Sequence, residues 1–178
     1  MAVLIPFLVC FFIQVTKSQL ICQYPNVTCV ENDLVKIYWE LNGLHQNDSR
    51  LIDFIKTKIL VPPDPLPLNL RGEPSMKRLG GQFDQVPTVE KLLNLKKSRK
   101  KGFFIEAGAS CGEFISNTLF FEMQYKWTGL LVEPNPDLLK SLYAKHRNAW
   151  ILPHCLSTTE FVEVVNFDVA YYNRLEDI

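Results

Sequence analysis

One stretch of this sequence decides the fold: Phe103-Phe104-Ile105-Glu106-Ala107-Gly108-Ala109-Ser110-Cys111-Gly112. Its unbroken apolar start predicts a buried parallel strand that is covered on both faces. The strand ends in an acidic residue and then breaks into two glycines, which let a backbone pass close to a ligand where a Cβ would collide. The stretch therefore predicts a ligand-binding turn behind a buried strand.

A second apolar run also ends in a carboxylate. Gly129-Leu130-Leu131-Val132 is followed by Glu133, which lies 21 residues beyond Gly112. Residues 113–125 between the two runs predict a crossover helix with one apolar face, formed by Ile115, Leu119 and Met123. This order predicts a nucleotide-binding βαβ unit: a strand, a glycine turn, a helix and a second strand that ends in an acidic residue. In such a unit the second acidic residue accepts hydrogen bonds from ribose hydroxyls.

The unit is expected to continue with a second helix and a third strand. Asn135 offers an N-cap oxygen and Pro136 suits the first helical position, so a helix is predicted to run to about Arg147. Trp150-Ile151-Leu152 predicts the third strand, in the usual order 3-2-1. The fold class is α/β, with a Rossmann-like sheet behind a helical and extended N-terminal arm.

The glycine spacing indicates which nucleotide suits the turn. A dinucleotide site needs G-x-G-x-x-G, whereas this turn reads E-x-G-x-x-x-G. A ligand without phosphates, such as S-adenosylmethionine, suits the spacing better. The alternative is a tight strand-to-helix turn in which Glu106 bonds loop amides. The residues expected at the cofactor are Glu106, Gly108, Ala109, Gly112, Glu133, Pro134 and Asn135.

Composition narrows the classes of partner. The chain has 178 residues, of which 47% are hydrophobic, and its 19 basic and 19 acidic residues balance. A packed core is therefore expected, and no net charge directs the chain to nucleic acid. No metal site is predicted.

The N-terminus predicts entry into the secretory pathway. Residues 2–15 are apolar except for Gln14. As a helix they would span about 21 Å, less than the roughly 30 Å hydrocarbon core of a membrane. This length favours a signal peptide that comprises residues 1–18 and is cleaved. A signal anchor that associates with the membrane through residues 2–15 is the alternative.

Sequons and cysteines agree with that compartment. Asn26-Val27-Thr28 and Asn47-Asp48-Ser49 are predicted glycosylation sites. Cys22 and Cys29 are the expected disulfide pair. Cys111 and Cys155 are expected to be free thiols. The strands beyond which they lie are predicted to be about 9.5 Å apart, which exceeds the roughly 7 Å limit on the Cα–Cα distance of a disulfide.

The segment before the nucleotide unit is predicted to form an arm. Ser49 or Asp48 caps a helix that must stop before Pro62-Pro63. The proline-rich residues 62–68 are expected to pack on the domain as a stiff arm, with a peptide-recognition ligand as the alternative. Thr88 is predicted to cap a helix over 89–95, and the basic run 96–101 is interpreted as a solvated turn.

The longer motifs resemble a known family. Phe103 to Ala109, Ser116-Asn117-Thr118-Leu119, Trp127 to Pro136 and Ala149-Trp150 are similar to the arthropod Star-like branch of the FkbM-type methyltransferases. The similarity covers roughly residues 45–165. It implies a class I methyltransferase fold, with Glu106 and Gly108 near the methionine part of S-adenosylmethionine and Glu133 on its ribose.

The sequence departs from this family at two places. Cys111 stands where the family turn usually carries an acid, and the chain stops at Ile178, 76 residues from Phe103 inclusive. We therefore expect a C-terminally truncated methyltransferase domain over 102–178, after an arm over 19–101. No catalytic residue is predicted, because neither His154 nor Asp168 is placed as a general base.

Three functions follow as hypotheses. The resemblance implies a Star-like protein of the secretory pathway, acting in ER-to-Golgi or endosomal trafficking, or in export of growth-factor ligands, through contacts with cargo or a membrane protein. It equally implies an S-adenosylmethionine-dependent O-methyltransferase that acts on a hydroxyl, for example on a sugar. The glycosylated arm suggests a third function, a non-enzymatic secreted binding module.

Overall fold

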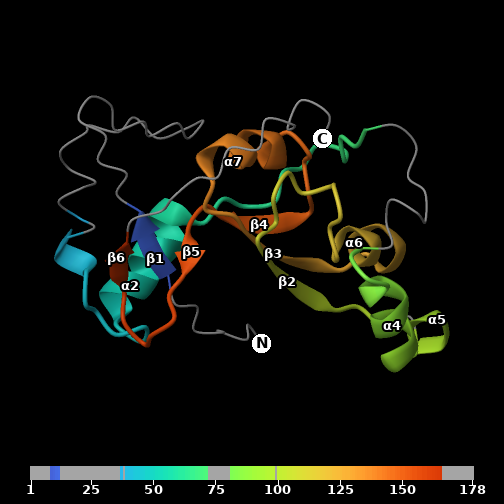
Figure 1. Ribbon diagram of the computed structural model, residues 1–178, viewed down its shortest axis with the longest axis horizontal. Helices are drawn as coiled ribbons and strands as arrows, with labels where there is room; N and C mark the ends of the chain where they lie inside the picture. The colour runs from blue at the N-terminus through green and yellow to red at the C-terminus, as the bar shows by residue number, and fades with distance from the viewer. Residues whose placement is uncertain (1–8, 13–36, 38, 72–80, 99, 166–178) are drawn as a thin grey trace. The chain divides into compact units, whose positions relative to one another are not determined.

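The computed structural model describes residues 9–12, 37, 39–71, 81–98 and 100–165, which form two compact units. One unit combines the chain up to Leu60 with the chain from His154, and the other contains Val61–Pro153. Figure 1 shows both units with their helices and strands. The predicted domain boundaries, after residues 18 and 101, stay predictions.

The Val61–Pro153 unit is built on a three-stranded parallel sheet. Its strands are β2 (Phe103–Ala107), β3 (Thr128–Val132) and β4 (Ala149–Leu152), in the order β2-β3-β4 (Figure 1). Ile105 lies opposite Leu130, which in turn lies opposite Trp150. The predicted α/β class is confirmed to this extent, as a mixed structure compatible with a Rossmann-like fold.

One face of this sheet carries the core. α6 (Leu119–Tyr125) and α7 (Pro136–Tyr143) pack on it, because both crossovers run in the same direction along the sheet. The buried side chains that meet there come from all three strands and both helices and include Phe104, Phe120, Phe121, Leu131, Leu139, Leu142 and Ile151. Asn135 caps α7 by accepting from the Asp137 amide at 2.9 Å, so the predicted cap is confirmed.

The opposite face of β2 differs from the prediction. Phe103 and Ile105 are 54% and 38% exposed, so the strand is not covered on both faces as its apolar run indicated. The physical reason is position, since β2 is an edge strand of the described sheet. Trp150, on the same face of β4, is 41% exposed.

Two predicted helices begin at the wrong residue. The crossover helix starts at Leu119 instead of Glu113. The Ser116 hydroxyl accepts a hydrogen bond from the Leu119 amide at 3.1 Å, and this bond holds residues 116–118 outside the helix. The helix predicted over 89–95 is α4 (Gln85–Leu92), and Thr88 donates to the Asp84 carbonyl inside it. A short helix, α5 (Leu95–Ser98), leads on to β2.

The proline-rich arm belongs to the same unit. Val61 forms an antiparallel bridge with Ile151 on the outer edge of β4, through bonds of 3.0 and 2.9 Å. Asn69 then donates to the carbonyls of Ala144 and Lys145 behind α7. The arm therefore covers one edge of the sheet and satisfies the carboxyl end of a helix through Val61 and Asn69. Between these two contacts Leu66 is 57% exposed, so the prediction that residues 62–68 pack on the domain is wrong for that leucine.

The other unit contains a helix and a small sheet. α2 (Ser49–Phe54) is capped by Asp48, continues as η1 (Ile55–Ile59) and ends before the prolines, as predicted. β1 (Val9–Phe12) lies between β5 (Cys155–Leu156), to which it is antiparallel, and β6 (Glu163–Val165), to which it is parallel.

The N-terminal prediction is not tested by this unit. β1 falls inside the predicted signal segment, residues 1–18. Among the described residues, no helix is long and apolar enough to cross a membrane. The signal peptide and the anchor both stay predictions.

Candidate functional site

The glycine turn follows β2 and bends sharply. Gly108 and Gly112 both have φ +78°, and Ser110 between them has φ +52°. A Cβ on Gly112 would collide with Cδ1 of the fully buried Leu142, so packing as well as the backbone angle favours glycine here. A Cβ on Gly108 would meet no atom within 4 Å, so only its backbone angle favours glycine.

The turn directs several of its amides into the protein. The N–H groups of Gly108 and Ala109 both donate to the Val132 carbonyl, at 2.9 and 3.0 Å. The Ser110 N–H donates to Glu133 Oε2 at 2.7 Å. The turn is thereby fastened to the end of the next strand, which brings the two predicted cofactor-binding segments together.

Glu133 lies buried at this junction. Its other carboxylate oxygen, Oε1, accepts from the Asn135 amide at 2.8 Å, and the residue is 4% exposed. Burial raises the pKa of Glu133, and the two amide bonds oppose that effect. Pro134 is half-buried between Glu133 and the helix cap. The carboxylate therefore fixes the start of α7 relative to the glycine turn.

Glu106 is held by the loop that precedes α6. Its Oε1 accepts from the Asn117 amide at 2.7 Å, and its Oε2 accepts from the hydroxyls of Ser116 at 2.8 Å and Thr118 at 2.6 Å. Charge-assisted bonds of this length are strong. Glu106 therefore bonds its own loop, which is the alternative that the sequence left open for it.

Behind this loop lies a buried ion pair. Arg147 Nε donates to Glu122 Oε2 at 2.6 Å, and the Arg147 guanidinium also donates to the Gly112 carbonyl and to Thr118 Oγ1. Its Cζ lies 5.8 Å from the centre of the Phe104 ring. Arg147 therefore connects α6, the glycine turn and β2, and Thr118 extends the network to Glu106.

A second buried pair fastens the arm. Lys145 Nζ lies 2.6 Å from Glu113 Oε2, with side chains that are 10% and 7% exposed. Glu113 also accepts from the Arg71 amide at 2.9 and 3.1 Å.

Sequence reasoning missed these four charged residues. Glu122 stands inside the apolar run 119–123, and that interruption is the one signal that could have identified it. Arg147, Glu113 and Lys145 have no such local signal, because their partners lie 25 to 42 residues away in sequence.

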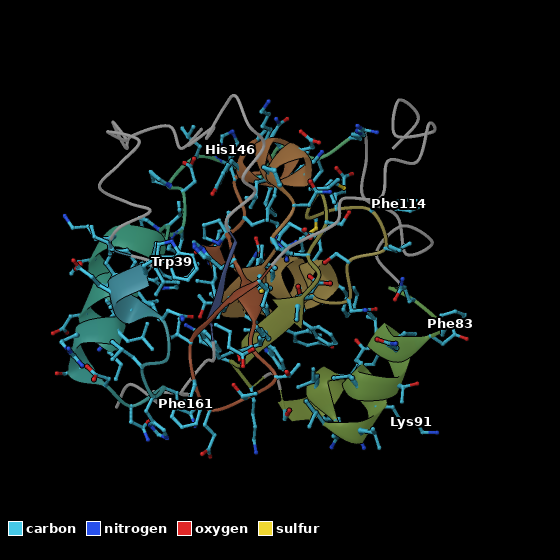
Figure 2. The ribbon with its side chains drawn as sticks, turned by 60° about the vertical axis from the view of Figure 1, so that its left-hand side comes forward. Trp39, Phe83, Lys91, Phe114, His146 and Phe161 are labelled. Atoms are coloured by element: carbon cyan, nitrogen blue, oxygen red, sulfur yellow. The ribbon has the colours of Figure 1, made fainter. Side chains whose placement is uncertain are left out.

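The tip of the turn carries exposed apolar side chains. Phe114 is 53% exposed and its amide donates to Cys111 Sγ at 3.4 Å (Figure 2). Ile115 is 42% exposed at φ +51°, an unusual backbone angle for a β-branched residue. The prediction that Ile115 lies on the buried face of a helix with Leu119 and Met123 was wrong, because the loop around Glu106 delays the helix.

Some of the residues predicted from the sequence lie outside the residues that the structure describes. Cys22, Cys29, Asn26 and Asp168 lie outside the described residues. Asn47 is exposed, as a glycosylation site requires. Cys111 is a buried thiol that forms no disulfide.

His154 is buried, and burial lowers its pKa to about 3. Among the described residues, no cluster of three or more metal-ligating side chains occurs. Neither observation assigns a catalytic role.

A cavity of about 390 Å³ lies elsewhere in the same unit. Asp64 and His146, whose Oδ2 and Nδ1 atoms are 2.8 Å apart, line it together with Lys126. None of the residues predicted at the cofactor lines this cavity. It is therefore separate from the glycine turn.

The hydrogen bonds of the turn bear on whether it can hold S-adenosylmethionine. The three amides that fasten the turn have acceptors in the protein, and both oxygens of Glu106 and of Glu133 have donors there. Cys111 brings no charge to the sulfonium. Glu133 accepts one bond at each oxygen and Glu106 accepts three bonds in all, so both carboxylates are engaged inside the protein.

Comparison with known proteins gives no relative for this chain. No family model, no curated protein and no solved structure matches it.

Proposed function

We propose that this chain is a Star-like protein of the secretory pathway, with a methyltransferase-type fold, that works through protein contacts without transferring a methyl group. The observation that carries the proposal is the state of Glu106. The carboxylate that the family resemblance assigns to the cofactor accepts three bonds from Ser116, Asn117 and Thr118. Trafficking or export of growth-factor ligands is the role that the resemblance suggests.

Calorimetry tests the non-catalytic half of the proposal. We expect no heat of binding when S-adenosylmethionine is titrated into the folded chain. Saturable binding that is weakened in Glu133→Gln would overturn it, because that variant keeps the shape of the side chain and removes the charge assigned to the ribose. Asp137→Asn, which removes an exposed charge on α7, is the matched control.

Glycosylation tests the compartment. Asn47 is exposed, and Asn26 belongs to the second sequon. In secretory cells, we expect the chain to migrate faster after endoglycosidase treatment and after the double change Asn26→Gln with Asn47→Gln. A chain that carries no glycan in any of these cells would count against the secretory assignment.

Cargo binding tests the role itself. A tagged chain should co-precipitate with a co-expressed growth-factor precursor and increase its export from the cell. Unchanged export and absent co-precipitation, with the chain correctly localised, would remove the trafficking role and leave the secreted binding module.

The second candidate is an S-adenosylmethionine-dependent O-methyltransferase. One observation favours it: the space beside Gly108 is open to a Cβ, and the bond from Ser110 to Glu133 brings the turn and the second acid to the same edge of the sheet. Transfer of labelled methyl groups from S-adenosylmethionine to a hydroxyl acceptor would establish this function. Its absence, together with silent calorimetry, would exclude it.

A further inference from the structure

The cavity of about 390 Å³ in the Val61–Pro153 unit lies at the amino ends of the strands, away from the glycine turn. The turn and Glu133 follow the carboxyl ends of β2 and β3, whereas Lys126 and Asn148, which line the cavity, precede β3 and β4. In open α/β sheets, nucleotides bind at the carboxyl ends of the strands. The cavity is therefore independent of the site that the sequence predicted.

Lys126 brings a positive charge without a partner to the wall of this cavity. Of the two acidic side chains there, Glu122 is paired with Arg147, and Asp64 with His146. Lys126 is exposed at the end of α6 and forms no hydrogen bond or ion pair in the described part of the chain. An ammonium group beside a cavity attracts a carboxylate. The cavity therefore favours a ligand with a single negative charge.

His146 adds a hydrogen-bond acceptor to the same wall. Asp64 Oδ1 accepts from the Leu66 amide at 2.8 Å, and Asp64 Oδ2 lies 2.8 Å from His146 Nδ1. The Leu66 amide and His146 hold the pKa of Asp64 below its usual value, so Asp64 is a carboxylate and Nδ1 of His146 carries the hydrogen. In the neutral ring Nε2 is then an acceptor, and it has no partner among the described residues. A ligand hydroxyl is a donor that suits it.

Both residues have a backbone angle that normally belongs to glycine. Lys126 has φ +55° at the end of α6, and His146 has φ +51° just beyond α7 (Figure 2). Helices commonly end in a residue of this conformation, and it is usually glycine because a Cβ is disfavoured there. Strained residues of other types gather at binding sites. An ammonium and an imidazole therefore occupy positions at this cavity that glycine would fill with less strain.

We infer that this cavity binds a small hydroxy acid with an apolar chain. The carboxylate pairs with Lys126, the hydroxyl donates to His146 Nε2, and the chain packs on Leu66, Leu68 and Met123, which form an apolar part of the wall. The exposed Leu66 is covered in this way. A water molecule takes up roughly 30 Å³ of liquid, so the cavity suits a ligand of about a dozen non-hydrogen atoms.

Calorimetry of the whole chain with 3-hydroxyoctanoate, a hydroxy acid of this size, tests the site. We expect saturable binding that is about tenfold or more weaker in Lys126→Gln, with circular dichroism verifying that the variant is folded. Lys140→Gln, on the exposed side of α7 and outside the cavity, should bind like the wild type. Octane-1,3-diol, which lacks the carboxylate, should bind the wild type as weakly as the acid binds Lys126→Gln. Absence of binding to the folded wild type, or undiminished binding to Lys126→Gln, would overturn the proposal.

A second comparison tests the hydroxyl and the place of binding. Octanoate lacks the hydroxyl and should bind the wild type more weakly than 3-hydroxyoctanoate. His146→Gly removes the ring at a backbone angle that suits glycine, so this variant should bind the two acids equally. In the wild type, the amide NMR signals of Leu66 and Lys126 should shift on binding, while those of the turn 108–112 stay in place. A wild type that does not distinguish the two acids, or shifts confined to the turn, would contradict the proposal.

Discussion

Arg147 Nε and Glu122 Oε2 lie 2.6 Å apart, with side chains that are 0% and 3% exposed. This pair connects α6 and the loop before β4 to the glycine turn, since Arg147 also bonds the Gly112 carbonyl. A buried charge left without its partner destabilises a protein strongly, whereas replacing both charges by apolar residues is often neutral. Replacing one residue of this pair should therefore destabilise the protein more than replacing both.

We predict that Arg147→Met lowers the free energy of unfolding by about 3 to 5 kcal/mol, because it leaves the Glu122 carboxylate buried without a counter-charge, with only the Asn148 amide donating to its Oε1 at 2.8 Å. The double variant Arg147→Met with Glu122→Leu should recover a large part of that loss. Urea unfolding followed by circular dichroism measures both. A double variant as unstable as the sum of its two single variants would mean that the ion pair is not the reason for the loss.

Gly112→Ala is predicted to destabilise the protein more than Gly108→Ala. Both positions have φ +78°, which costs an alanine on the order of 1 to 2 kcal/mol. At Gly112 the new Cβ also collides with Leu142 Cδ1, whereas at Gly108 it meets nothing within 4 Å. Thermal unfolding of the two variants gives the comparison, and equal losses would refute the packing role of Gly112.

His154 should make stability depend on pH. Burial lowers its pKa in the folded state to about 3, below its usual value near 6.5. Its contribution is therefore complete above about pH 6.5 and is lost as the pH falls toward 3, with a slope of at most about 1.4 kcal/mol per pH unit.

The test is a comparison of unfolding free energies at several pH values between 5 and 7 for wild type and for His154→Gln. The wild type should lose more stability on acidification than the variant. Parallel pH profiles would contradict the buried neutral histidine.

Local sequence signals predicted the sheet well. The apolar runs before Glu106 and Glu133 are strands, and Asn135 with Pro136 begins α7, because strand propensity and helix capping are decided by neighbouring residues. The start of a helix was predicted wrongly where a side chain from another element bonds residues that would otherwise be helical. Glu106 holds Ser116 in a loop, so the helical spacing of Ile115 with Leu119 does not form a helix.

The chemistry of the site was less predictable than the fold. Glu106 and Glu133 were identified as residues at the turn, but their hydrogen-bond partners decide whether they face a ligand, and those partners are set by tertiary structure. The predicted order 3-2-1 placed β2 at one end of the sheet, as observed. The exposure of one face of β2 was not predicted, because an unbroken apolar run does not record which face of a strand lacks a covering element.

Glu106 holds its own loop through three hydrogen bonds, and we propose that it does not bind S-adenosylmethionine. The most direct measurement is urea unfolding of wild type and Glu106→Gln, each with and without excess S-adenosylmethionine. We predict that the variant is less stable by about 1 to 3 kcal/mol, since the loop hydroxyls and amide lose a charged acceptor, and that the ligand shifts neither midpoint. A ligand-dependent rise in the wild-type midpoint that Glu106→Gln abolishes would contradict the account.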